Sequence, residues 1–190
     1  MRKAFLTLTA ILLISGSLFA QQAANTPPTA EQVLLEATAL AKKEHKSVFI
    51  IFHASWCGWC HKMDDSMNDP AVKTYFDKSY VIRHLTVMEA KGKENLENPG
   101  ASDLLKKYNS DGYGIPVWFI FDKNRKLLAD SHIRPAGTGF EVKGSGIIGC
   151  PAAKEEVAEF IAALKKSSSL KENELAAIAD RFSKNSQAGH

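Results

Sequence analysis

A short apolar run followed by two closely spaced cysteines constrains this 190-residue chain more than any other feature. Residues 47–52 read Ser-Val-Phe-Ile-Ile-Phe, a β-branched and aromatic run that is typical of a buried strand. From Cys57 onward the pattern changes, because Cys60, Met63 and Met67 follow at intervals of three and four residues, which predicts a helix. The two cysteines therefore lie at the first turn of a helix that follows a buried strand.

This position favours reactive sulfur chemistry. Unpaired backbone N–H groups and the positive end of the helix dipole stabilise a thiolate, and the thiolate is the form of cysteine that attacks a disulfide. Residues three apart on a helix share one face, so the sulfurs of Cys57 and Cys60 come close enough to bond. We expect Cys57 to attack a substrate and Cys60, one turn deeper, to resolve the mixed disulfide.

Two motifs carry a resemblance to a known family. Residues 56–60, Trp-Cys-Gly-Trp-Cys, follow a strand and resemble the signature Trp-Cys-Gly-Pro-Cys of the thioredoxin superfamily. Residues 114–119, Gly-Ile-Pro-Val-Trp-Phe, are similar to the segment in which that family places a cis-proline beside its dithiol. Pro116 lies 56 residues after Cys60, and an insertion near residues 88–100 would account for a separation longer than that of a minimal thioredoxin.

The resemblance covers residues 48–131, and it is closest to thioredoxin-like proteins with a Trp-Cys-Gly-Trp-Cys-His-Lys-Met site and to the carboxyl-terminal domain of the bacterial periplasmic disulfide reductase. It implies an α/β thioredoxin fold, with a central mixed sheet flanked by helices. It also implies thiol–disulfide exchange with protein substrates, in the reductase or isomerase direction rather than as an oxidase. Electrons would come from the thiols of an unidentified redox partner, so no cofactor is expected.

The same resemblance implies a docking face around the cysteines. A cis bond before Pro116 would leave the backbone of Ile115 free to pair with an extended substrate chain. Trp56, Gly58 and Trp59 would shape the surface beside it. Trp59 replaces the usual proline between the cysteines, and this dipeptide tunes thiolate stability, so thioredoxin's reduction potential does not transfer to this chain.

The strand also departs from the thioredoxin pattern. Thioredoxin has a buried aspartate six positions before the first cysteine, whereas this chain has Ile51 there. The group that accepts a proton from the Cys60 thiol must therefore be another one. His53, His61 and Glu89 are the candidates, and for each the alternative is a solvated side chain near the site.

A c-type haem protein is a competing interpretation. Residues 57–61 read Cys-Gly-Trp-Cys-His and match the C-x-x-C-H pattern of haem attachment, and Met63, Met67 or Met88 could be a distal ligand. We rank it second because the strand before the motif and the Gly-Ile-Pro segment have no role in a haem pocket. An absorption spectrum distinguishes the two, since a haem protein has a Soret band.

Other interpretations of the cysteines are a structural disulfide, a zinc site and a non-catalytic binding module. A bridge across so small a loop constrains the unfolded chain little, and two further zinc ligands at a recognisable spacing are missing, so no metal is expected. A binding module would keep its function after replacement of Cys57 by serine. The third cysteine, Cys150, is either a structural thiol or a regulatory one that pairs with Cys57 or a partner.

The N-terminus predicts export. Residues 1–20 resemble a secretory signal peptide: Arg2 and Lys3 are followed by an apolar run and by small residues before a cleavage site after Ala20. The run is short for the alternative, an uncleaved anchor. We expect a periplasmic or secreted protein that does not span the membrane after cleavage. The remaining 22 basic and 21 acidic residues nearly balance, which argues against nucleic acid as a partner.

The rest of the chain predicts one domain. Residues 21–28 are expected to be a flexible leader, residues 29–184 a single, monomeric thioredoxin-like domain, and residues 185–190 a frayed tail. Strands are predicted near residues 47–52, 80–87, 116–121 and 126–131, and helices near 30–45, 57–68, 71–78, 101–108, 151–166 and 170–182. This order predicts a mixed sheet with helices on both faces, and the last helix lies beyond the minimal fold.

Overall fold

The fold is built around a four-stranded mixed sheet, in a computed structural model that describes residues 26–186. Its strands are β1 (Ser47–His53), β2 (Tyr80–Thr86), β3 (Val117–Phe121) and β4 (Leu127–Asp130), in the spatial order β2-β1-β3-β4. β1 is parallel to β2 and antiparallel to β3, and β4 is antiparallel to β3. β3 is buried throughout and β1 is buried except at its two ends, so both central strands are covered on both faces.

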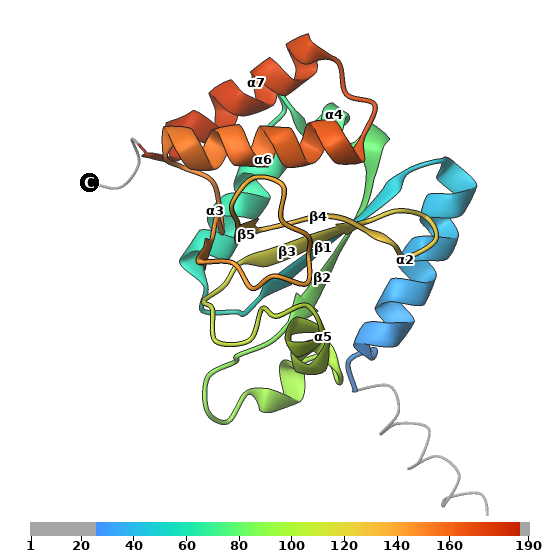
Figure 1. The fold of residues 1–190 in the computed structure, drawn as a ribbon. Helices are drawn as coiled ribbons and strands as arrows, with labels where there is room; N and C mark the ends of the chain where they lie inside the picture. Colours follow the sequence, from blue (N-terminus) through green and yellow to red (C-terminus); the bar gives the residue numbers. More distant parts are fainter. Residues whose placement is uncertain (1–25, 187–190) are drawn as a thin grey trace, which may run out of the picture.

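Helices cover both faces of this sheet (Figure 1). One face packs against α2 (Ala30–Glu44) and α5 (Ala101–Lys107). The other face packs against α3 (Gly58–Met67), α4 (Lys73–Ser79), α6 (Lys154–Ser167) and α7 (Glu172–Ser183). The predicted mixed sheet between helices, with an additional C-terminal helix, is confirmed.

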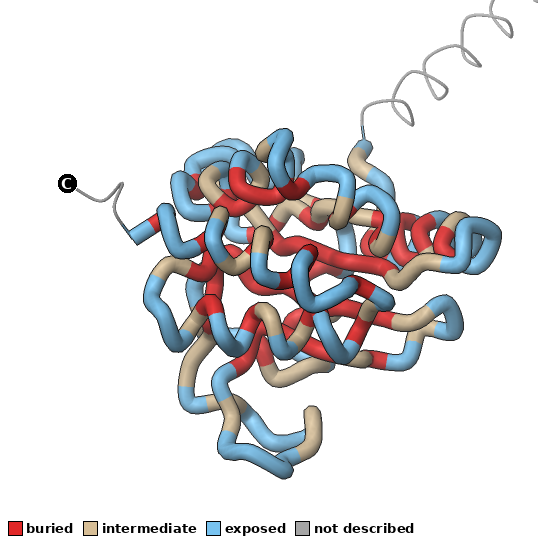
Figure 2. The backbone as a smooth tube through the Cα atoms, turned by 90° about the horizontal axis from the view of Figure 1, so that it is seen from above, coloured by how far each residue is buried: buried red, intermediate tan, exposed pale blue. Residues whose placement is uncertain are grey.

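The side chains of β1 alternate between two cores. Phe49 and Ile51 belong to the core under α3, α4, α6 and α7, whereas Val48, Ile50 and Phe52 belong to the core under α2 and α5. This alternation follows from the two-residue period of a strand. Figure 2 shows the buried strands enclosed by exposed backbone on the outside of the molecule.

Phe160 of α6 anchors the first of these cores. Its ring centroid lies 4.8 Å from that of Phe182 on α7, 5.5 Å from that of Trp118 on β3 and 6.5 Å from that of Phe76 on α4. The additional helix α7 is therefore part of the main core, because Phe182 is itself fully buried there.

Two helices begin later than the sequence predicts. The helix expected from residue 71 begins at Lys73, because Asp69 closes a turn: its carboxylate accepts a hydrogen bond from the Ala71 N–H at 3.0 Å. The helix expected from Pro151 begins at Lys154, because the Glu156 carboxylate reaches back to the N–H groups of the two alanines just before α6, at 3.0 and 2.9 Å.

Residues 132–149, which lie between the last predicted strand and the helix predicted near residues 151–166, contain a small hairpin. β5 (His132–Ile133) pairs antiparallel with β6 (Gly146–Ile147). Strands of two residues are too short to carry a periodic pattern, which is why the sequence did not reveal them. Two short 3₁₀ helices, η1 (Glu94–Leu96) and η2 (Lys184–Ser186), complete the described elements.

The chain ends also differ from expectation where the structure describes them. The predicted frayed tail is wrong at its start, since Asn185 is buried and its side-chain N–H donates to the Pro151 carbonyl at 3.0 Å. At the other end, the Pro28 carbonyl accepts a hydrogen bond from Asn98 at 2.7 Å. The predicted signal peptide, residues 1–20, the leader up to residue 25 and the tail from residue 187 lie outside the described residues.

No helix within residues 26–186 combines the length and the apolar character needed to cross a membrane.

Candidate active site

Cys57 and Cys60 form a disulfide at the start of α3. β1 ends at His53, and four residues later Cys57 occupies the N-cap position of α3. The backbone N–H of Cys60 donates a hydrogen bond to Sγ of Cys57 at 3.2 Å. In the reduced protein the same N–H would stabilise a thiolate on Cys57, as the sequence pattern predicts.

The disulfide lies just below the surface, and an exposed tryptophan precedes each of its two cysteines in the chain. Cys57 is 3% exposed and Cys60 is 1% exposed, whereas Trp56 and Trp59 are 58% and 50% exposed. Trp56 is held by a hydrogen bond from Nε1 to the Met88 carbonyl at 2.7 Å. Large apolar side chains that stay exposed beside a buried reactive bond are suited to contact a second molecule.

Gly58 and Trp59 form the dipeptide between the cysteines. Gly58 is exposed, and a Cβ atom at that position would meet nothing within 4 Å, so the local space does not require glycine there. The ammonium of Lys62 lies 4.8 Å from the centroid of the Trp59 ring, a cation–π contact one turn along α3.

The Ile115–Pro116 segment lies next to the disulfide. Val117, the first residue of β3, pairs with Phe52 near the end of β1, so the sheet brings residue 116 to the edge from which the cysteine loop leaves. The peptide bond between Ile115 and Pro116 is cis. The carbonyl oxygen of Ile115 lies 3.6 Å from Sγ of Cys57.

A groove of about 470 Å³ begins at this point. Its lining is mostly apolar and comes from four separate stretches of the chain: Trp59, Ile115, Pro116, Ile148, Gly149, Cys150, Ala152, Ala153, Glu156 and Ser186. The sequence predicted the first three of these as docking residues. It did not predict the wall formed by residues 148–156, because that wall belongs to a loop without periodic pattern and to the start of α6.

The three candidate proton acceptors bind other groups. The Glu89 carboxylate accepts hydrogen bonds from the Ser55 N–H at 2.6 Å and its hydroxyl at 2.8 Å, and the backbone bond is the main reason why the pKa of Glu89 is lowered. His61 bonds the Ser55 carbonyl through Nε2 at 3.1 Å. His53 contacts the Thr86 hydroxyl at 3.2 Å. Glu89 and His61 thus hold the loop before Cys57.

A pair of histidines, His53 and His84, lies beside α3 and was not predicted from the sequence. Nε2 of His84, on β2, lies 2.8 Å from the carboxylate of Asp64, which is one turn after Cys60 on α3. The His84 ring lies 4.9 Å from the His53 ring. Burial, and secondarily the proximity of His84, lower the pKa of His53 and so favour its neutral form. Only the parallel pairing of β1 and β2 places these residues together.

Cys150 has the environment of a structural thiol. It is buried, and its sulfur accepts a hydrogen bond from the Asn185 side chain at 3.6 Å. Burial raises the pKa of Cys150 to about 12, which keeps it protonated at neutral pH. These features favour the structural interpretation over a regulatory one.

A family model described as thioredoxin-like matches residues 29–123. A search of curated proteins finds no match. Among solved structures, a disulphide isomerase from Xylella fastidiosa Temecula1 is 22% identical, with a TM-score of 0.42, and the match covers 51% of this chain and 69% of that one.

Two further solved structures are similar. The oxidised C-terminal domain of DsbD from Neisseria meningitidis is 20% identical over 55% of this chain and 84% of its own, with a TM-score of 0.39. The DsbH oxidoreductase is 23% identical over 75% of this chain and 88% of its own, with a TM-score of 0.40. The family match spans half of the chain and includes β1 and the cysteine pair, and this chain therefore belongs to the thioredoxin-like family.

Proposed function

We propose that this protein is an exported thiol–disulfide oxidoreductase that exchanges disulfides with protein substrates through Cys57 and Cys60. One observation carries the proposal: the bonded pair sits at the start of α3, where the Cys60 N–H donates to Sγ of Cys57 and the Ile115 carbonyl lies 3.6 Å away. A bridge that served stability alone would gain little from closing so short a loop.

The exchange proceeds in two displacements. The Cys57 thiolate of the reduced protein attacks one sulfur of a substrate disulfide, and a mixed disulfide forms as the other substrate sulfur leaves and takes up a proton. Cys60 then loses its proton and attacks Sγ of Cys57, which forms the Cys57–Cys60 bond and releases the second substrate thiol. Two electrons pass to the substrate, and a partner dithiol must return them.

The docking face lies where the groove meets the disulfide. The backbone of Ile115 pairs with an extended substrate chain, as a strand added beside Cys57. Trp56 presents an exposed ring next to Cys57 in the chain, and Trp59 and Pro116 line the apolar groove, which accepts substrate side chains.

We infer the reductase or isomerase direction from the site sequence Trp-Cys-Gly-Trp-Cys-His-Lys-Met, which resembles that of periplasmic disulfide reductases. The equilibrium of the cysteine pair with glutathione tests the direction. A potential near about −270 mV supports a reductant, whereas a potential near about −120 mV is that of a disulfide donor and would reverse the inference.

Two variants test the activity itself. Cys60→Ser should accumulate a mixed disulfide between Cys57 and a disulfide-containing protein substrate, visible as a band of higher mass on a non-reducing gel. Cys57→Ser should form no such band and should have no turnover. Substrate reduction at the wild-type rate by Cys57→Ser would refute the proposed function and favour a binding module.

A c-type haem protein would need Cys57, Cys60 and His61 in a different arrangement. Haem attachment would use both sulfurs as thioethers and an imidazole nitrogen of His61 as an iron ligand. Here the sulfurs bond each other, and Nε2 of His61 faces the Ser55 carbonyl at 3.1 Å. A Soret band in the spectrum of the purified protein would overturn the thiol–disulfide proposal.

A further inference from the structure

The loop that leads to Pro116 is tied to the segment of residues 132–149. Four polar contacts join the two: Asn109 Nδ2 to the Glu141 carbonyl at 3.4 Å, Ser110 Oγ to His132 Nε2 at 2.9 Å, Lys143 Nζ to the Asp111 carbonyl at 3.4 Å, and the Tyr113 hydroxyl to the Gly144 carbonyl. In three of these four contacts a side chain donates to a backbone carbonyl. The fourth, between Ser110 and His132, is buried.

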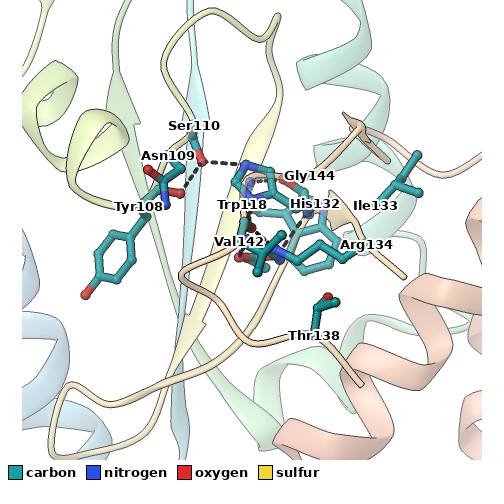
Figure 3. Close-up of polar contacts among 12 residues, drawn as sticks. Tyr108, Asn109, Ser110, Trp118, His132, Ile133, Arg134, Thr138, Val142 and Gly144 are labelled. Carbon is teal, nitrogen blue, oxygen red and sulfur yellow. Dashed lines mark hydrogen bonds and ion pairs between the residues drawn. The ribbon is translucent and has the colours of Figure 1, made fainter. Parts of the chain in front are cut away.

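The neighbours of His132 determine which of its two ring nitrogens carries the proton (Figure 3). Nδ1 of His132 contacts a terminal nitrogen of Arg134, and the Arg134 guanidinium binds both oxygens of Asp130, at 2.6 and 2.9 Å. A guanidinium only donates hydrogen bonds, so Nδ1 must accept one and the imidazole proton must be on Nε2. His132 therefore donates its hydrogen bond to Ser110.

This assignment excludes one function and supports another. A nucleophilic serine needs an unprotonated histidine nitrogen to take its proton, but the nitrogen of His132 that faces Ser110 carries a proton. The Ser110–His132–Asp130 group is therefore not a hydrolase triad. It is a buried clamp, in which Asp130 holds Arg134, Arg134 holds His132, and His132 holds the loop at Ser110.

The clamp acts on the same loop that approaches the disulfide. Ser110 precedes Ile115 by five residues, and the Ile115 carbonyl is the group that lies 3.6 Å from Sγ of Cys57. The other end of this loop is held by the neighbouring Ser131, whose hydroxyl accepts a hydrogen bond from the Trp118 N–H at 3.2 Å. Residues 110–116 carry no regular secondary structure, so the shape of this loop depends on such contacts.

We propose that His132 is a positioning residue for substrate docking, which holds the Ile115 carbonyl beside Cys57 through Ser110 and does so only in its neutral form. The inference rests on the proposed function, because it concerns the same docking face. It gives residues 130–134 a role in substrate docking, although they are far in sequence from Cys57 and Cys60.

The charges around His132 set the direction of its pH dependence. The charged neighbours of His132 are Asp130 at the end of β4, Arg134 beyond β5 and Lys143 before β6. Tyr113, in the loop that leads to Pro116, has its ring centroid 5.2 Å from that of His132. Burial is the main cause of a lowered pKa of His132; Arg134 and Lys143 act in the same direction and Asp130 opposes them.

Protonation of His132 would place an N–H on Nδ1 against the N–H groups of Arg134. Because the pKa of His132 is lower in the folded protein than the value of about 6.5 in the unfolded chain, the folded state favours the neutral ring. The clamp is therefore fully formed above about pH 6.5 and is lost as the pH falls through the folded-state pKa.

Steady-state kinetics on matched variants test the proposal. Ser110→Ala should raise KM for a protein disulfide about fivefold to tenfold, the effect of one lost hydrogen bond, with the rate on a small aromatic disulfide unchanged. His132→Gln keeps a donor for Ser110 but does not titrate, so it should keep the wild-type KM at pH 7.5 and abolish the rise in KM that we expect for wild type as the pH falls through the folded-state pKa of His132. Thr138→Ala is the matched control, because it removes a hydroxyl that bonds Pro135 within the same segment.

Amide hydrogen exchange of residues 109–117 provides a readout that does not depend on activity. Exchange there should be faster in Ser110→Ala, and in wild type it should accelerate at acidic pH beyond the intrinsic effect of pH. If wild type reduces no protein disulfide, the proposed function fails while the exchange data still decide the clamp. Wild-type KM in Ser110→Ala together with unchanged exchange, or wild-type exchange that shows no excess acceleration at acidic pH, would overturn the inference.

Discussion

Asn185 offers the sharpest test of how the C-terminal part of the chain supports the cysteine helix. Its side-chain N–H donates to the Pro151 carbonyl at 3.0 Å, and its carbonyl accepts from Ser66 on α3 at 3.1 Å and from Arg181 on α7 at 3.2 Å. Replacement by alanine removes these three bonds, together with the weaker one to the Cys150 sulfur at 3.6 Å, from a buried position. At about 1 kcal/mol for each bond, the expected loss of unfolding free energy is about 3 kcal/mol.

The other contacts of the Asn185 partners set a lower limit on this loss of unfolding free energy. Arg181 retains its ion pair with Asp69 at 2.6 Å, and the Ser66 hydroxyl retains the Lys62 carbonyl at 2.7 Å, so neither is left without a partner. The Pro151 carbonyl loses the Asn185 donor, and a buried carbonyl without a partner costs a further amount of about 1 kcal/mol or more. The loss should therefore not fall much below 3 kcal/mol.

Thermal and urea unfolding of Asn185→Ala measure this loss. For a domain of this size, about 3 kcal/mol corresponds to a fall in Tm of about 6 to 12 °C. Asn124→Ala, at an exposed position in the β3–β4 turn, is the matched control and should change Tm little. Equal Tm values for the two variants would mean that residues 184–186 do not support the fold, and the reasoning would be wrong.

Three further predictions concern burial. Phe160→Ala should lower the unfolding free energy by about 3 to 5 kcal/mol, because its ring fills the core between α6, α7 and β3, and urea titration would show a smaller loss if that core were loosely packed. Cys150 should resist alkylation in the native protein at pH 8, since a pKa of about 12 leaves about one thiolate in ten thousand; rapid modification seen by mass spectrometry would contradict this. Asp130→Asn should lower the unfolding free energy by about 3 kcal/mol, because it leaves the Arg134 guanidinium without its buried counter-charge, and an unchanged urea midpoint would refute the clamp's contribution to stability.

The parts of the fold that the sequence predicted are those with local signals. Residues 47–52 form a continuous apolar run, and the structure extends this strand only to His53. Thr29 and Gln32, which have the spacing of a capping box at the start of the helix predicted near residues 30–45, form that box in α2 with hydrogen bonds of 3.2 and 2.8 Å. Cys57 and Cys60 stand where a strand-to-helix transition places them. In each case the pattern and the structure involve the same few neighbouring residues.

The parts that the sequence did not predict depend on distant contacts. The clamp joins Ser110 to His132 across 22 residues, and Asn185 meets Ser66 across 119 residues. A lone buried histidine or asparagine carries no periodic pattern that would distinguish it from a solvated one. The sequence did contain one usable sign, since Asp130, His132 and Arg134 alternate along a short stretch and alternating side chains of a strand share one face.

The two halves of the chain contribute differently to the proposed activity. The stabilising N–H of Cys60 and the Gly58-Trp59 dipeptide, which together tune the reduction potential, lie within the family match at residues 29–123. The far wall of the groove and the clamp on the docking loop lie outside it, in residues 130–156. Under the proposed function, the potential depends on groups that touch the sulfurs, so changes in the far wall of the groove should alter which proteins dock without altering the potential. Changes in the clamp can alter both, because the clamp positions the Ile115 carbonyl beside Sγ of Cys57. If the proposed function is correct, substrate choice can therefore change through the groove wall independently of the reduction potential.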